Sequence, residues 1–535
     1  MNNKKLFPFL ILILFFISFV FPQPADKTIK TKNIKNISTK DVTNFYKNNP
    51  EEIVQLLSAK DSSWSKSYGG TNLDYGECVI STSDGGLLIA GCTQSFGVGS
   101  YDFLVIKLNM DGGISWAKTY GGGNSDFAWT ALQTSDGGYL IGGETSSYGA
   151  GNNDFFIIKI DSEGNPSWAK AYGGDQIDFI YSMAETSDGK FVAVGNTNSF
   201  GSGGFDFMIM KFDSSGNVSW CETFGDAQDD DANYVISTSS GGCLVAGRTV
   251  SSAGNSAFLL ISLDSDGATL WEKAYAVGSV DKAYSICKTS DGYLVLGSTN
   301  SGSDDNFLII KINSSGDVSW AETIGDSGDD EPYSVVETSD NGFIVTGSTD
   351  SYGSGGKDFF IVKLDSTGSI TWAKTFGGNN DDEAKSVIQT SGGEYVITGS
   401  TESFGTNKEV LTIMLNTSGT IPDCNHLASC TPSKNSVTVN SITSTFLATA
   451  VIITTTSVTT STSTPSLTMN TPCCGDNGAT LDVNGDGKVD AVDLCETLNA
   501  IVGNIPSDSR YDINCDGNVD STDSEIIASS LAGNN

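Results

Sequence analysis

The 535-residue chain has little histidine and little positive charge, and each shortage excludes a class of function. His426 is the single histidine, so general-base catalysis by histidine and a histidine-rich metal site are nearly excluded. Lysine and arginine total 29 against 64 aspartates and glutamates, which gives a formal net charge of −35. A surface this acidic argues against nucleic-acid partners and anionic lipid, and it favours cations.

Long apolar runs are also missing, apart from one at the start of the chain. Lys4 and Lys5 precede an apolar run over residues 6–21, and the small residue Ala25 follows it. This arrangement predicts a signal peptide over residues 1–25, with an uncleaved membrane anchor as the alternative. No other run is long enough to span a bilayer. We therefore expect a secreted protein, extracellular or attached to the cell surface through a scaffold, with no membrane segment after signal cleavage.

The chain has eleven cysteines, an odd number, so at least one is free or paired between chains. Export permits disulfides. Cys78 and Cys92 flank a turn and could face each other across a hairpin. Other cysteines lie in the C-terminal module or bracket the segment after residue 423: Cys424, Cys430, Cys473, Cys474, Cys495 and Cys515.

What the chain has in abundance is glycine, 61 residues, and much of it belongs to a repeat. Each unit contains an apolar run such as "DFLVIKL" and a turn such as "TSDGG", which divide it into four short predicted strands. Four strands in about 50 residues are typical of a β-propeller blade. Each unit is marked by a tryptophan, spaced 49 to 52 residues from the next: Trp64, Trp116, Trp168, Trp220, Trp271, Trp320 and Trp372.

The two ends of this array predict a closed ring. Asp423 stands where the last unit should have its next tryptophan, so that unit lacks a fourth strand, whereas Trp64 lies in a fourth strand with no strands before it. Joining the two removes two open sheet edges. We therefore expect an all-β, seven-bladed propeller over residues 62–423, closed by the N-terminal strand. The units resemble bacterial and archaeal secreted β-propeller repeats with a "WAKTYGG…TSDGG" consensus, a likeness that implies architecture and leaves the chemistry open.

An aspartate follows each tryptophan by ten residues, and two interpretations are open. The seven carboxylates could ring one mouth of the channel and attract a cation, or each could cap backbone N–H groups in its own turn. Repetition in every unit favours the structural role. Tyr120 and Tyr172 also recur and could stack on sugars, although packing is favoured. The seven aspartates are Asp74, Asp126, Asp178, Asp230, Asp281, Asp330 and Asp382.

The segments on either side of the array differ in composition. Residues 26–61 are rich in lysine and asparagine and then weakly helical, which predicts a linker with one short helix. Residues 424–474 are dominated by serine and threonine and are bracketed by cysteines. This second segment is interpreted as a spacer with some strand content, or alternatively as a small β-element stapled by its cysteines.

Two acidic loops near the C-terminus share one pattern, 30 residues apart. Hard oxygen donors at alternate positions, with a glycine at position 6 for the sharp turn, are typical of a loop that wraps Ca²⁺. Lys488 and Asn518 would contribute backbone carbonyls at position 7. We expect two calcium ions, one held by Asp482, Asn484, Asp486, Asp490 and Asp493 and the other by Asp512, Asn514, Asp516, Asp520 and Asp523.

Each loop is followed by a predicted helix but not preceded by one, and position 12 is Asp where an EF-hand usually has Glu. These duplicated loop–helix halves resemble a type I dockerin, which implies a small α-helical, EF-hand-like domain over residues 475–535. The resemblance implies a cohesin partner on a scaffoldin or cell-surface protein. In that family positions 10 and 11 often form a Ser/Thr pair that contacts cohesin. Here the second half has Ser521 and Thr522, but the first has Ala491 and Val492; Leu494 and Leu498 form an apolar stripe beside them.

Three functions remain open from the sequence. The regular repeats and the lack of an asymmetric catalytic cluster favour a non-catalytic binding or structural platform in a cellulosome-type, polysaccharide-degrading assembly. Because the dockerin resemblance implies polysaccharide catabolism and a glycosidase needs only two carboxylates, a carbohydrate-active enzyme is the alternative. The third possibility is a purely structural surface protein.

Overall fold

The computed structural model describes residues 63–300, 304–422 and 424–442, with short stretches at 449–450, 454–457, 461–463 and 468–470. All regular structure in these residues is β-strand. They belong to one compact unit, Ser62–Pro472. No described residue lies in a helix that is long and apolar enough to cross a bilayer. The predicted signal peptide, linker and calcium loops lie outside the described residues.

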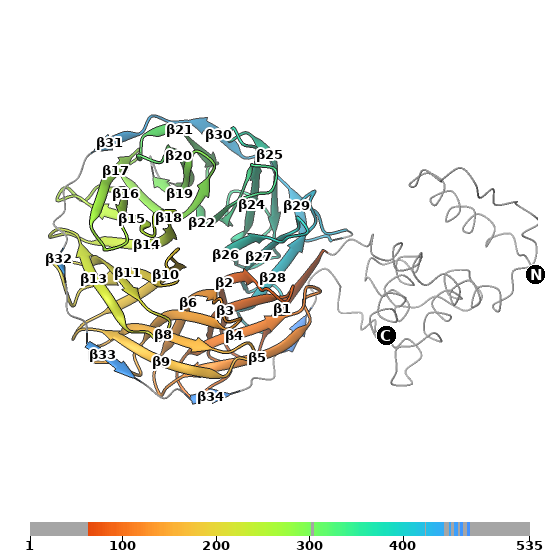
Figure 1. The fold of residues 1–535 in the computed structure, drawn as a ribbon. Coiled ribbons are helices and arrows are strands. Elements are labelled where there is room, and N and C mark those ends of the chain that lie inside the picture. The colour runs from red at the N-terminus through yellow and green to blue at the C-terminus, as the bar shows by residue number, and fades with distance from the viewer. Residues whose placement is uncertain are drawn as a thin grey trace, which may run out of the picture. The chain divides into compact units, whose positions relative to one another are not determined.

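Seven antiparallel sheets surround a common axis as the blades of a propeller, which confirms the predicted fold class (Figure 1). In each blade the first strand lies nearest the axis. Blades one to three contain β2 (Asp74–Ser81), β3 (Leu87–Thr93), β4 (Asp102–Leu108) and β5 (Ile114–Gly121); β6 (Asp126–Gln133), β7 (Tyr139–Thr145), β8 (Asp154–Ile160) and β9 (Pro166–Gly173); and β10 (Asp178–Glu185), β11 (Phe191–Thr197), β12 (Asp206–Phe212) and β13 (Val218–Phe224).

The remaining blades repeat the pattern, and the seventh takes its fourth strand from the start of the chain. Blades four to seven contain β14 (Asp230–Ser237), β15 (Cys243–Val250), β16 (Ser256–Leu263) and β17 (Thr269–Ala276); β18 (Val280–Thr289), β19 (Gly292–Asn300), β20 (Asp305–Asn313) and β21 (Val318–Gly325); β22 (Asp330–Glu337), β23 (Phe343–Thr349), β24 (Asp358–Leu364) and β25 (Ile370–Phe376); and β26 (Asp382–Gln389), β27 (Tyr395–Thr401), β28 (Glu409–Leu415) and β1 (Trp64–Gly69).

The "TSDGG" motif forms the hairpin between the first two strands of a blade. In blade one the backbone N–H of Thr82 donates to the carbonyl of Gly86 at 3.0 Å, and the Thr82 hydroxyl donates to Asp84 at 2.5 Å. Gly85 has a φ of 84°, a left-handed conformation that glycine adopts without a steric penalty. The motif therefore sets the turn, and with it the register of the two strands.

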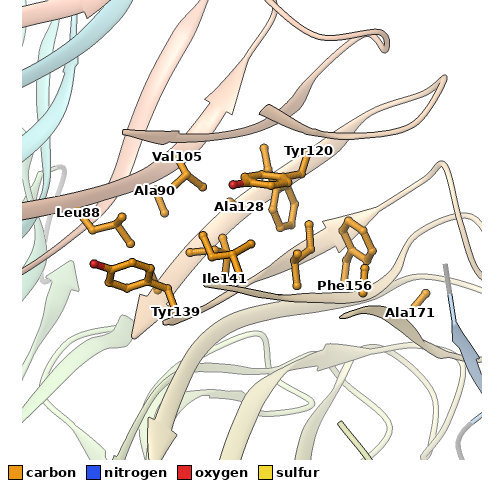
Figure 2. Packing of buried hydrophobic residues seen from close by; sticks show 14 residues of the cluster. Leu88, Ala90, Val105, Tyr120, Ala128, Tyr139, Ile141, Phe156 and Ala171 are labelled. Carbon is orange, nitrogen blue, oxygen red and sulfur yellow. The ribbon is translucent and has the colours of Figure 1, made fainter. Parts of the chain in front are cut away.

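Apolar faces of neighbouring blades pack against each other to form the core. Between blades one and two, Phe103 and Phe156 meet edge to face with their ring centroids 5.2 Å apart. Both are fully buried, as are Tyr120 and Ile141 in the same cluster (Figure 2). The "DF" phenylalanine of blade one, Phe103, thus belongs to the core between blades, and that of blade two, Phe155, is fully buried in the next such cluster.

The ring is closed by the N-terminal strand, as the sequence predicts. Strand β1 pairs antiparallel with β28, from Trp64 opposite Met414 to Tyr68 opposite Val410. Tyr68 is fully buried, and its hydroxyl donates to the carbonyl of Gly112 in blade one at 2.8 Å. Closure therefore joins residues more than 300 positions apart into one sheet.

The Ser/Thr-rich segment forms seven further strands, each of which is the fifth and outermost strand of a different blade (Figure 1). We call these strands the outer belt. Their order around the ring runs against that of the blades, from blade six back to blade one and then to blade seven. The strands are β29 (Leu427–Ser429) on β25, β30 (Ser433–Ser436) on β21, β31 (Asn440–Ile442) on β17, β32 (Thr449–Ala450) on β13, β33 (Thr454–Ser457) on β9, β34 (Ser461–Ser463) on β5 and β35 (Thr468–Asn470) on β1.

The outer belt has a physical basis in strand pairing. A four-stranded blade leaves the N–H and C=O groups of its outer edge unpaired, and such edges invite association with other chains. The belt pairs with each edge over two to four residues, for example Ser433 to Ser436 against Gly325 to Glu322. Its strands begin 5 to 9 residues apart, so the same chain reaches each blade in turn.

The expected Cys78–Cys92 pair is wrong. Cys78 lies opposite Ala90 and Cys92 lies opposite Tyr75, because the hairpin pairs Ser81 with Leu87 and so leaves Cys78 two residues out of register with Cys92. Both cysteines are free thiols, and so is Cys430, whereas Cys424 is disulfide-bonded.

Candidate functional site

The seven repeated aspartates begin or nearly begin the inner strands, and all seven side chains are fully buried. Asp126 is representative. Its carboxylate accepts hydrogen bonds from the backbone N–H of Gly122 and the hydroxyl of Ser147, both at 2.8 Å, and from the hydroxyl of Thr145. These contacts hold the turn before the inner strand against the end of the second strand. They are the contacts of a capping carboxylate.

Burial raises the pKa of Asp74 and of Asp126, and it raises that of Asp230 to about 6. Asp102, from the third strand of blade one, lies close to Asp126. A side chain at Gly121 would come within 2.0 Å of Asp102 and 2.7 Å of Asp126, which explains the glycine in this "YGG" motif. Within the described residues, no three His, Cys, Asp or Glu side chains are grouped so that they could hold a metal ion.

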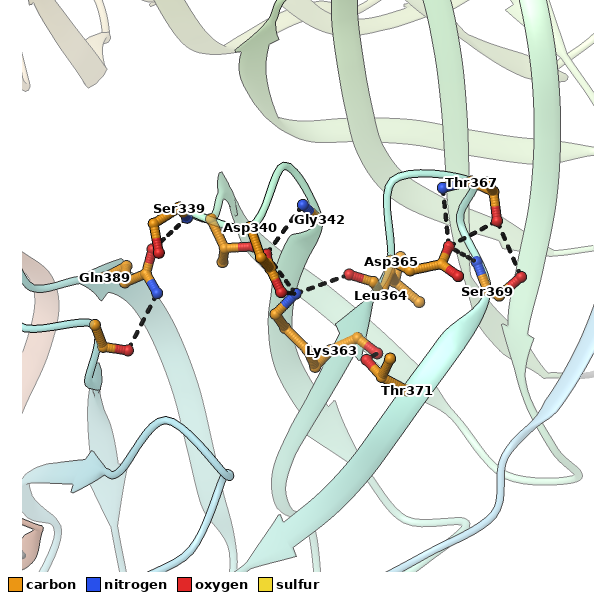
Figure 3. A network of polar contacts seen from close by, with 12 residues as sticks. Ser339, Asp340, Gly342, Lys363, Leu364, Asp365, Thr367, Ser369, Thr371 and Gln389 are labelled. Atoms are coloured by element: carbon orange, nitrogen blue, oxygen red, sulfur yellow. Dashed lines mark hydrogen bonds and ion pairs between the residues drawn. The ribbon is translucent and has the colours of Figure 1, made fainter. Parts of the chain in front are cut away.

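The lysine of the "DFLVIKL" motif also has a structural environment. Lys363 is 3% exposed, forms an ion pair with Asp340 at 2.9 Å, and donates to the carbonyl of Leu364 at 3.0 Å (Figure 3). Lys107 pairs with Asp84 in the same way, at 3.0 Å. The hydrogen bond from Thr82 and the ion pair with Lys107 lower the pKa of Asp84 to about 2.

Tyr120 and Tyr172 are fully buried and donate their hydroxyls to backbone carbonyls of the next blade, Gly164 at 2.6 Å and Gly216 at 2.8 Å. They are therefore packed between blades and present no face to a sugar. The repeated tryptophan is similar in role, since Trp168 donates its indole N–H to the carbonyl of Ser214 at 3.0 Å.

Every inner strand contains a β-bulge at the same place, three residues after the aspartate. The ladder skips one residue there, as between Ala128 and Thr130 in blade two. Bulges re-aim side chains and are common beside functional sites. The residues skipped, which we call the bulge residues, differ in chemistry from blade to blade: Glu77, Trp129, Tyr181, Asn233, Tyr284, Tyr333 and Lys385.

The chain's own seven repeats show which positions vary. The aspartate is present in all seven inner strands, and its partner across the ladder is always a threonine, as in Asp74 opposite Thr93. The residue after the aspartate and the bulge residue vary freely. Neighbouring bulge residues touch across blades, with Trp129 and Tyr181 at 5.9 Å and Tyr284 and Tyr333 at 5.6 Å between ring centroids. A constant framework thus supports a variable surface at the axis.

In blades one to three this surface is a continuous row of aromatic rings, which we call the aromatic arc. Each ring is partly exposed. Successive centroids are between 4.6 and 6.3 Å apart. Phe127 and Trp129 are stacked with an interplanar angle of 16°. The members in order of contact are Tyr75, Tyr101, Phe127, Trp129, Tyr181, Phe179 and Phe205.

In blades four to seven the residue after each aspartate is charged, as Lys282 and Glu383 are, although the bulge residue is charged only in blade seven; we call the charged residues of this half the charged arc. Lys357 pairs with Glu331 at 2.9 Å and Lys385 with Glu383 at 3.0 Å. Lys385 also lies 3.7 Å from the centroid of Tyr333. The remaining members are Asp231, Arg248, Lys282, Glu402 and Lys408.

Glu77 stands where the two arcs meet in blade one. Burial raises its pKa to about 7, against the opposing effect of Lys385. At the other end of the inner strands, Ile80, Val336 and Ile388 line a hollow of ≈ 560 Å³. A smaller hollow of ≈ 300 Å³ lies between blades six and seven, where His426 packs edge to face on Phe404.

Sequence reasoning missed both arcs because it followed what the repeats share. The informative signal is the set of positions at which the repeats differ. When the units are aligned on their aspartate, the first and third residues after it are those that change. Trp129, the one tryptophan outside the repeat, lies at the second of these variable positions and indicates the pattern.

Comparison with protein-family models gives two matches. Residues 134–166 match a β-propeller domain of unknown function, DUF5122. Residues 480–532 match the dockerin type I domain. The chain carries a type I dockerin. This confirms the resemblance inferred from the two acidic loops. The dockerin match covers the part of the chain that follows the propeller.

The dockerin's calcium and partner residues lie outside the described residues, so their geometry stays a prediction. The donor set itself suits the ion, because carboxylate and amide oxygens at this spacing are hard ligands that Ca²⁺ prefers. Asp482 and Asp512 begin the two loops, and type I dockerins are calcium-binding domains.

Comparison with solved structures finds several matches at low identity. The WD40 β-propeller domain of Doa1 is 15% identical, with a TM-score of 0.43 over 66% of this chain and 97% of that one. Sqt1 from Chaetomium thermophilum is 10% identical, with a TM-score of 0.36 over 64% and 82%. A protein of unknown function from Dyadobacter fermentans is 11% identical, with a TM-score of 0.36 over 66% and 98%. A search of curated proteins finds no match.

Proposed function

We propose that this chain is a secreted, carbohydrate-binding component of a cellulosome-type assembly. Its dockerin attaches it to a cohesin, and its propeller presents the aromatic arc to a polysaccharide. The aromatic arc is the observation that carries the proposal. Seven partly exposed rings in contact, on three of seven blades, form an apolar surface suited to the faces of sugar rings.

The attachment follows from the dockerin. Two calcium ions, bound by the loops that begin at Asp482 and Asp512, would neutralise carboxylates whose mutual repulsion opposes folding. Ser521 and Thr522 would contact the cohesin, and the unlike pair Ala491 and Val492 makes the two halves unequal. Removing calcium with excess EDTA should therefore abolish cohesin binding and leave the propeller folded. Tight cohesin binding in the presence of the chelator would contradict this.

The binding role is tested by incubating the purified chain with a panel of polysaccharides. We expect retention on at least one polysaccharide without release of reducing ends. Trp129→Ala and Tyr181→Ala should each weaken that binding about tenfold or more, since each removes a central ring of the arc. Leu270→Ala, which changes a side chain that is 58% exposed outside the arc, should leave binding unchanged.

Two outcomes would change this conclusion. Release of reducing ends would indicate a carbohydrate-active enzyme, with Glu77 the first carboxyl group to replace. Failure to bind any polysaccharide would indicate a structural surface protein.

A further inference from the structure

The charged arc contains one cation that has no acceptor among the described residues. Lys282 follows Asp281 at the start of β18, in blade five, and is partly exposed. Its ammonium lies 5.0 Å from the ring centroid of Tyr284, and it forms no ion pair with a carboxylate among the described residues. Every other lysine of the arc pairs with a carboxylate, as Lys357 does with Glu331 at 2.9 Å.

The neighbouring acid is already engaged. Asp231, in blade four, accepts a hydrogen bond from the side-chain amide of Asn196 at 2.8 Å on one oxygen and an ion pair from Arg248 on the other. Asn196 is itself oriented, because its amide oxygen accepts the backbone N–H of Ala232 at 2.8 Å. The Asp231 carboxylate is therefore held toward blade three and Arg248, and it does not bond the ammonium of Lys282.

Arg248 has an unmet donor as well. Its Nε–H is buried and has no hydrogen-bond partner among the described residues. Burial lowers the pKa of Lys282, as does the nearby charge of Arg248, although Asp231 acts in the other direction. A partly desolvated cation with an unmet donor is unfavourable, and a bound anion would reduce that penalty.

A hydrogen bond between blades four and five holds the strands of Asp231 and Lys282 together. The side-chain amide of Asn233, the bulge residue of blade four, donates to the carbonyl of Ala283 in blade five at 2.8 Å. That bond ties β14 to β18 within two residues of Asp231 and Lys282. The aromatic arc ends beside them, since the carbonyl of Phe205 accepts the backbone N–H of Asp230, the residue before Asp231, at 2.6 Å.

We infer that Lys282, with Arg248, forms a subsite for the carboxylate of an acidic sugar, so that the propeller binds a uronic-acid-containing polysaccharide. This rests on the proposed carbohydrate-binding function and names its ligand class. The aromatic arc would hold the sugar faces while the ammonium of Lys282 receives the carboxylate, a charge-assisted hydrogen bond. The chain's net charge of −35 does not prevent this, because at physiological salt charges beyond about 8 Å are screened.

The test uses the full chain and two probes with the same sugar backbone, trigalacturonate and its uncharged methyl ester. We expect trigalacturonate to bind at least tenfold more tightly by titration calorimetry. Lys282→Met keeps most of the length of the side chain and removes the charge, so it should abolish that difference. Lys288→Met, an exposed lysine at the far end of the same strand, should preserve it. Melting temperatures of both variants establish that they are folded.

The results distinguish failure of the acidic-sugar subsite from failure of the proposed carbohydrate-binding function. Equal affinity for the two probes, or a difference that survives Lys282→Met, would overturn the acidic-sugar subsite and leave carbohydrate binding in place. Acetate that binds as tightly as trigalacturonate would overturn the saccharide ligand, since the aromatic arc would then contribute nothing. Absence of binding by every saccharide would overturn the proposed function itself.

Discussion

At the residue scale, aspartate has two opposite electrostatic roles in five of the seven blades; the hairpin turns of blades four and seven have Ser240 and Gly392 instead. The aspartate at the head of the inner strand is fully buried, and burial raises the pKa of members such as Asp178. The aspartate of the hairpin turn is exposed and paired with lysine; a threonine hydrogen bond and that lysine lower the pKa of Asp136 to about 2. The first fixes the contact between turn and strand, and the second fixes the hairpin.

Two aspartates in one turn allow a matched test of the buried role. Asp178 accepts the backbone N–H of Gly174 at 2.9 Å and the hydroxyl of Ser199 at 2.8 Å. Asp178→Ala should lower the free energy of unfolding by about 2–4 kcal/mol, because it leaves buried donors without acceptors. Asp175→Ala, an exposed residue in the same turn, should change it by less than about 0.5 kcal/mol. Urea denaturation followed by tryptophan fluorescence gives both values, and equal effects would contradict a capping role for Asp178.

At the scale of the elements, local patterns predicted the blades, whereas the outer belt escaped prediction. Turn motifs and apolar alternation mark each of the four strands of a blade, and the missing and spare strands at the two ends predicted that β1 closes the ring. The belt strands are only two to four residues long, and their partners lie up to about 400 residues away, as Ser67 does from Asn470. No local sequence pattern predicts strand pairings between residues so far apart in the chain. The arcs escaped as well, because the bulge that re-aims Trp129 interrupts strict alternation.

The belt's contribution can be measured by replacing residues 431–470 with a Gly/Ser linker of equal length. We expect the propeller to fold but to melt at a lower temperature and to self-associate, because six of the seven outer edges lose their partners, while β29 stays on blade six. Differential scanning calorimetry and light scattering report the two effects. The same replacement at residues 26–50 serves as the control. A monomeric protein with an unchanged melting curve would show that the belt does not protect the blades.

At the scale of the whole molecule, the two kinds of carboxyl group set opposite limits on stability. Raised pKa values favour the protonated form in the folded state, so stability is lost as pH rises through them. Lowered pKa values give stability that is present above about 4 and lost as pH falls toward about 2. Burial is the largest cause of the raised values, about 7 for Glu77, Glu144 and Asp358 and about 6 for Asp154, Asp206 and Asp230.

The propeller should therefore be most stable in mildly acidic solution, between about pH 4 and 6. We expect the urea midpoint to be higher at pH 5 than at pH 8 and to fall again below about pH 3, where the lowered pKa of groups such as Asp84, about 2, is approached. All eight tryptophans lie between residues 64 and 372, so their fluorescence reports the propeller and not the dockerin. A midpoint that rises steadily from pH 5 to pH 8 would contradict the raised values.

The outer belt has a mechanical consequence for a chain that is held at its C-terminal end. Tension applied beyond Asn470 reaches the β35–β1 ladder first, and that ladder joins only three residue pairs, whereas β1 is held to β28 by five. The weaker ladder should peel before the ring opens, and the next belt strands should follow one blade at a time. Residues 427–470, fully unwound, would span roughly 150 Å at about 3.4 Å per residue. A propeller surrounded by such a belt can therefore lengthen under load, by releasing belt strands, while its blades stay folded.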